Sequence, residues 1–114
     1  MPTPSQKQNL LDAVSQIRAA EQLLLEASRS TSDPAKLIQL NTEYTHLDSF
    51  LSQILHAQAL TDDADFGDAT AALKSQVSAL NVDAESIKKI VDDVATAGKI
   101  VGFITKAIQV IGAL

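Results

Sequence analysis

Apolar side chains recur along the chain at steps of three and four residues, the spacing of one face of an α-helix. Three short polar segments interrupt the pattern, at 29–33, 61–65 and 81–83, and each contains Asp or Asn, which favour turns and helix starts. The interrupted pattern predicts four helices in a single domain spanning 1–114. The predicted helices cover about 4–29, 34–59, 62–80 and 84–113.

The first two predicted helices begin with strong capping signals. Thr3 precedes Pro4 and stands three residues before Gln6, an arrangement typical of a capping box with proline at the first helical position. Asp33 precedes Pro34 in the same way. Because the two helices have similar lengths and a short turn joins them, we expect an αα-hairpin. For the whole chain we expect an all-α antiparallel four-helix bundle.

The last predicted helix, 84–113, is the most apolar segment of the chain. Asp83 stands at its N-cap position, and few polar residues follow Lys99. The apolar residues lie on three faces of the helix, so it needs more cover than the other helices. We therefore expect the C-terminal helix to be the most buried element of the bundle.

The composition supports a helical fold with an aliphatic core. Apolar residues make up 46% of the chain, yet aromatic residues make up only 4% and Trp is absent. Four Gly and three Pro are too few for the frequent turns of a β-rich protein. The net charge is −5, and the one adjacent basic pair is Lys88-Lys89, so we expect no binding to nucleic acid.

The chain has no Cys, which excludes disulfides and thiolate metal sites. Its N-terminal segment, 1–9, lacks a basic stretch followed by an apolar one, so no cleavable signal peptide is expected. We therefore expect a cytoplasmic protein, or one exported without a cleavable signal peptide.

Glu43 and His46 are three residues apart, which is the spacing of metal-binding pairs in di-iron helical bundles. Such bundles need a second pair, and the other histidine, His56, lies about 15 Å further along the same helix. The acidic segment 62–68 fails the register of an EF-hand calcium loop, and no Gly-x-Ser-x-Gly elbow occurs. We therefore predict no metal site, no cofactor and no catalytic activity.

Gly98 and Gly102 form a Gly-x-x-x-Gly pair, which lets two helix backbones approach closely. We expect a non-catalytic assembly protein that self-associates, as a homo-oligomer, or docks a protein partner through the C-terminal helix. The expected interaction residues are Gly98, Ile100, Gly102, Phe103, Ile104 and Val110.

An alternative is a membrane-active protein in which the segment 97–114 inserts into a bilayer. Its 18 residues are near the lower bound for spanning hydrocarbon. Lys99 and Lys106 oppose a permanent span, because each charge at mid-bilayer costs about 3 kcal/mol on insertion scales. Assembly is therefore the first expectation and membrane insertion the second. A third possibility is a helical enzyme or carrier with a cavity between the predicted helices 34–59 and 84–113, which would show as stabilisation by a ligand.

The apolar segment from Ala97 to Leu114 resembles, in architecture only, two bacterial groups. Small helical subunits of secretion filaments, which lack Cys and Trp, bury an apolar C-terminal helix along the filament core. In α-helical pore-forming toxins, an apolar helical segment leaves a soluble bundle and enters the membrane. The resemblance covers about a sixth of the chain and implies assembly or membrane insertion, with no residue role carried over.

Overall fold

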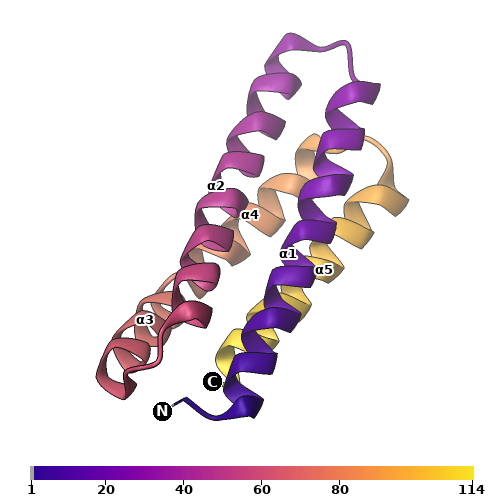
Figure 1. Ribbon diagram of the computed structural model, residues 1–114. Helices are drawn as coiled ribbons and strands as arrows, with labels where there is room; N and C mark the ends of the chain where they lie inside the picture. The colour runs from indigo at the N-terminus through magenta and orange to yellow at the C-terminus, as the bar shows by residue number, and fades with distance from the viewer. Residues whose placement is uncertain (1) are drawn as a thin grey trace.

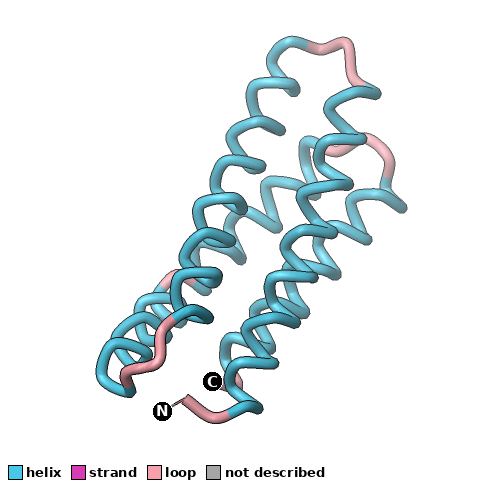
Figure 2. Tube along the Cα trace, viewed as in Figure 1, coloured by secondary structure: helices cyan, strands magenta, loops and turns pink. Residues whose placement is uncertain are grey.

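Five helices form the described part of the chain, residues 2–114, in a computed structural model. They are α1 (Pro4–Ser30), α2 (Pro34–Ala59), α3 (Asp63–Ser75), α4 (Val77–Ile90) and α5 (Val94–Gly112). Figures 1 and 2 show the helices and the short loops between them, and residues 2–114 contain no strand. The prediction of an all-α helical bundle is confirmed.

The local capping signals set the ends of α1 and α2. The Thr3 hydroxyl accepts a hydrogen bond from the Gln6 backbone N–H at 3.1 Å, and the Gln6 side chain accepts one from the Thr3 N–H at 2.9 Å. These reciprocal bonds complete the predicted capping box. Asp33 caps α2 by accepting from the Ala35 N–H at 2.9 Å. Both helices lie within one residue of their predicted bounds.

The predicted break at 81–83 is wrong, because α4 continues through these residues. Leu80, Ala84 and Ile87 are buried at helical spacing on both sides of the expected break, so unbroken packing keeps the segment helical. Asp83 is therefore an interior residue of α4, not the N-cap of the last helix. The chain bends instead at Gln76, whose φ of −95° and ψ of 0° remain right-handed helical. Thus α3 and α4 together form the third rod of the bundle.

The break before the last helix lies at 91–93, where the sequence predicted continuous helix. Asp93 is the N-cap of α5: its carboxylate accepts from the Ala95 N–H at 3.2 Å and from the Thr96 hydroxyl at 2.6 Å. These hydrogen bonds, led by that from Thr96, hold the pKa of Asp93 below its usual value. The helix predicted over 84–113 is therefore the end of α4 followed by a separate 19-residue helix.

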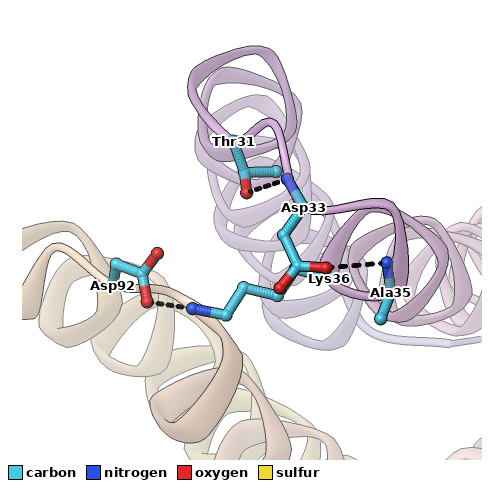
Figure 3. A network of polar contacts seen from close by, with 5 residues as sticks. All are labelled: Thr31, Asp33, Ala35, Lys36 and Asp92. Carbon is cyan, nitrogen blue, oxygen red and sulfur yellow. Dashed lines mark hydrogen bonds and ion pairs between the residues drawn. The ribbon is translucent and has the colours of Figure 1, made fainter.

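Polar side chains tie the helices together at both ends of the bundle. Figure 3 shows Lys36, in the first turn of α2, paired with Asp92 in the connection between α4 and α5. At the opposite end, the Lys7 ammonium donates to the backbone carbonyls of Gln58 and Leu60 and lies 5.5 Å from the centre of the Phe66 ring. These contacts link residues that are far apart in the sequence.

The core lies between four rods that fill an envelope of 48 × 21 × 20 Å. Figure 1 shows α2 running back along α1, and the two ends of the chain near the same end of the bundle. Helix α1 packs against both α2 and α5, and α4 covers a further side of α5. Helix α2 packs less closely on α4 than on α1.

The C-terminal helix is about as buried as α1 and α2, so the expectation that it is the most buried element is wrong. Five of the 19 residues of α5 are buried, against seven of 27 in α1 and seven of 26 in α2. The buried residues form one stripe at steps of three and four: Ala97, Ile100, Ile104, Ala107 and Ile111. The helix carries apolar residues on several faces, but only this stripe is fully buried. Val101, Phe103, Ile108 and Val110 beside the stripe are half-buried at the edge of the core.

Candidate functional site

The six expected interaction residues do not share one surface. Ile100 and Ile104 are 0% exposed and belong to the core facing α1 and α4. Gly98 is exposed, and Gly102 is half-buried on the outer side of the same helix. Phe103 and Val110 are also half-buried, and both pack against the edge of the core.

The outer face of α5, defined by Val94, Gly98, Gly102, Thr105, Gln109 and Gly112, carries small or uncharged side chains. Val94 is 84% exposed. A Cβ atom added at Gly98, Gly102 or Gly112 would meet no atom within 4 Å among the described residues. The two glycines of the Gly-x-x-x-Gly pair therefore bring no helices together within residues 2–114.

Charged residues on α5 lie at one side of this outer face. Lys99 and Lys106 are exposed, and the Lys106 ammonium lies 5.8 Å from the centre of the Phe103 ring, within cation–π range. The helix has no acidic residue. A solvent-facing helix usually presents several charges of both signs, so the outer face of α5 has the composition of a contact surface.

A second candidate site lies where α2 faces α4. Glu43 and His46 project from α2, and Asp83 reaches them from α4, with His46 Nδ1 3.1 Å from Asp83 Oδ1. One ligand atom from each of the three residues lies within 4.8 Å of the other two. Within residues 2–114, this is the one set of three or more such side chains close enough to hold a metal ion.

Burial perturbs the pKa of one acidic member of this cluster, Glu43. Glu43 is 8% exposed, and its Oε2 atom has no hydrogen-bond partner among the described residues. Burial, followed by the hydrogen bond and charge of Asp83, raises the pKa of Glu43 to about 7, against a smaller opposing effect of His46. Asp83 is also 8% exposed. Two buried carboxylates therefore face each other with one imidazole beside them.

The sequence revealed only part of this cluster. The Glu-x-x-His spacing placed Glu43 and His46 on one face of α2, as observed. Asp83 was missed because it was interpreted as a helix cap. Only the pairing of α2 with α4 brings it beside His46, and no local pattern predicts that pairing.

A surface cavity adjoins the cluster on the side of the Asp83 and His46 side chains. Its volume is about 490 Å³, and its lining includes Ser49, Phe50, Gln76 and Val82. A second cavity of about 290 Å³ lies beside Glu43, between Ile38 and Lys89. The three ligand candidates thus border space that water or a small ligand can enter.

A separate buried acid lies between α1 and α2. Glu21 is 5% exposed, and its Oε2 atom has no hydrogen-bond partner among the described residues. Burial raises the pKa of Glu21 to about 7, assisted by the hydrogen bond and charge of Asp48, while Tyr44 and Arg18 act in the opposite direction. Nearby negative charge, led by Glu21, raises the pKa of Tyr44.

Comparison with known proteins gives no relative for this arrangement. No protein-family model matches the chain, and no curated protein and no solved structure matches it. Within residues 2–114, α5 is the one helix that is long and apolar enough to cross a membrane, judged by length and composition alone.

Proposed function

We propose that this protein is a non-catalytic helical assembly module that self-associates through the outer face of α5. The observation that carries the proposal is the pair of open glycine positions on a helix whose only charged residues are Lys99 and Lys106. Gly98 and Gly102 lie one turn apart, and no described residue fills the space where their side chains would be. A helix from a second copy fits against such a face because its backbone can approach closely.

The chemistry of the face favours a helix as its occupant. Val94, Thr105 and Gly112 extend the uncharged strip beyond the two glycines, along a helix about 28 Å long. Lys99 and Lys106 lie at one side, where they can remain hydrated at the rim of an interface. Close packing of two such strips would exclude water from the exposed Val94 side chain and from the peptide groups beside the glycines.

The proposal is tested by filling the two open positions with the double variant Gly98→Leu/Gly102→Leu. Since neither position has an atom within 4 Å of the new Cβ, the monomer should fold. Replacing Gly in a helix also stabilises it, by about 0.5–1 kcal/mol per site. We expect light scattering after size-exclusion chromatography to show an oligomer for the unmodified protein and a monomer for the double variant.

Gly67→Leu is the matched control, because Gly67 is an exposed helical glycine of α3 that also has no atom within 4 Å of an added Cβ. It should stabilise the fold and leave the oligomer unchanged. A monomeric unmodified protein at all concentrations tested would overturn the proposal. So would a double variant that associates as strongly as the unmodified protein.

Membrane insertion of α5 is the second candidate, and the length and apolar composition of the helix favour it. Insertion would require the buried stripe that includes Ile100 and Ile104 to leave α1 and α4, so the core would have to open. Adding anionic liposomes to the same chromatography separates the two functions. An oligomer that stays out of the lipid fraction supports assembly, and a monomer that moves into it supports insertion.

A further inference from the structure

Glu43, His46 and Asp83 form a cluster whose members come from two helices. The first two lie one turn apart on α2, and the third lies on α4, across the space between the helices. The 3.1 Å separation of His46 Nδ1 and Asp83 Oδ1 already matches adjacent ligands of one metal ion. Ligands about 2.1 Å from a tetrahedral zinc ion lie about 3.4 Å apart.

An unsatisfied acceptor points to a missing ligand at this cluster. Glu43 is more than nine-tenths buried, and its Oε2 atom has no hydrogen-bond partner in the described part of the chain. A buried polar atom without a partner is costly, and a buried carboxylate next to a second carboxylate costs more. Among the ion pairs within residues 2–114, Asp83 has His46 as its partner and Glu43 has none. A bound cation would satisfy both carboxylates together.

We propose that Glu43, His46 and Asp83 bind a divalent first-row transition metal ion, for which Zn²⁺ is the probe. One imidazole and two carboxylates are the nitrogen and oxygen ligands that such ions accept. Ca²⁺ and Mg²⁺ fit less well, because they prefer a shell made of oxygen alone. This site lies on α2 and α4, and it is independent of the assembly proposed for α5.

The surroundings allow the ligands to close on the ion. The His46 side chain is 53% exposed, so it can rotate to bring its ring nitrogen into range without disturbing the core. Three protein ligands leave one tetrahedral position open, and the adjoining cavity of about 490 Å³ gives water access to it. The proposed site is therefore of the open type, with three protein ligands and one exchangeable position.

The experiment is titration of the metal-free protein with Zn²⁺ by isothermal calorimetry, together with thermal unfolding. We expect one ion per chain and, at a hundredfold excess over the dissociation constant, a rise in Tm of roughly 5–10 °C. Binding of Co²⁺ should add visible absorption bands, which report nitrogen and oxygen ligands directly. Asp83→Asn and His46→Ala should each weaken binding by about tenfold or more.

Glu43→Gln gives the sharpest test because it should keep or raise the stability of the metal-free protein while it removes the stabilisation by Zn²⁺. It removes a buried charge while keeping the shape of the side chain, so the metal-free variant should be at least as stable as the parent. The same change removes a ligand and should abolish the stabilisation by Zn²⁺. His56→Ala is the matched control: it changes an exposed histidine of the same helix and should leave binding unchanged.

Two results would overturn the proposal. The first is a protein that binds no Zn²⁺ and no Co²⁺ at millimolar concentration, in which case the two carboxylates share a proton and need no ion. The second is binding that Glu43→Gln, His46→Ala and Asp83→Asn leave unchanged, which would place the ion elsewhere on the surface.

Discussion

Replacing Ile104 by Asp is expected to unfold the protein at neutral pH. Ile104 is 0% exposed and lies in the middle of the buried stripe of α5, which packs against α1 and α4. The substitution loses the burial of a large aliphatic side chain, which costs about 2–5 kcal/mol, and adds an unpaired charge to the core. Together these costs approach the whole stability of a small domain, about 5–15 kcal/mol. Far-ultraviolet circular dichroism with urea titration measures the loss.

Val94→Asp is the matched control for this substitution. It introduces the same charge on the same helix, but the Val94 side chain is 84% exposed and lies in the first helical turn. An acidic residue there interacts favourably with the helix dipole, so the free energy of unfolding of the monomer should change by less than about 0.5 kcal/mol. If Ile104→Asp stays folded and alters association instead, Ile104 would belong to an outer contact surface and the core assignment would be wrong.

Replacing Glu21 by Gln is expected to stabilise the protein at pH 8. Glu21 is buried between α1 and α2, where Asp48 and the loss of water both disfavour its charged form. Gln keeps the size of the side chain and its capacity to hydrogen-bond Tyr44 and Asp48, but it carries no charge. We expect a gain of about 1–2 kcal/mol, less than the full shift in pKa implies, because solvent screens part of the interaction.

The effect of Glu21 depends on pH in a defined direction. Its pKa rises from 4.5 to about 7 on folding, so the folded state keeps its proton over a range in which the unfolded state loses it. Below pH 4.5 both states are protonated and the charge has no effect. As pH rises from 4.5 to 7, the free energy of unfolding falls. Above pH 7 it is lowered by the full cost of burying the Glu21 charge. Glu21→Gln should therefore match the parent protein at pH 4 and exceed it increasingly up to pH 7.

Urea unfolding at pH 4.5, 6 and 8 measures this dependence. Glu26→Gln is the control, because Glu26 is an exposed acid of the same helix, and it should leave the pH dependence of the parent unchanged. Glu43 contributes a similar trend in both the parent and Glu21→Gln, so the difference between these two proteins isolates Glu21. If the free energy of unfolding depends on pH equally in both proteins, Glu21 ionises in the folded state as easily as in the unfolded state.

Helix starts that are fixed by capping residues close in the sequence were predictable. Two helix starts are specified by hydrogen bonds that span three residues or fewer, those of Thr3 with Gln6 and of Asp33 with the Ala35 N–H. The later break was not predictable in the same way, since Asp83 and Asp93 both resemble N-caps. Packing decides between them: helix α4 keeps its buried stripe through Asp83, whereas the chain turns at 91–93.

The candidate sites were less predictable for the same reason. Periodicity shows that α5 is apolar on several faces, but it does not say which face the bundle covers, and Ile100 and Ile104 proved to be core residues. Gly98 and Gly102 were predicted as points where two helix backbones approach closely. No described residue of another helix lies within 4 Å of a Cβ added at either glycine, so their function in assembly stays a prediction. The contact of Asp83 with His46 depends on the pairing of α2 with α4, which no local pattern contains.

The packing of α1 against α5 has a consequence for how the protein folds during synthesis. Helices α2, α3 and α4 lie between these two helices in sequence, so the contact of α1 with α5 closes the largest loop in the fold. Helices α1 and α2 can pair early as a local hairpin, but one apolar side of α1 stays open to water until residues 94–112 leave the ribosome. The nascent hairpin therefore exposes an apolar surface through most of translation. During this period the chain is most prone to aggregate and most available for binding by chaperones.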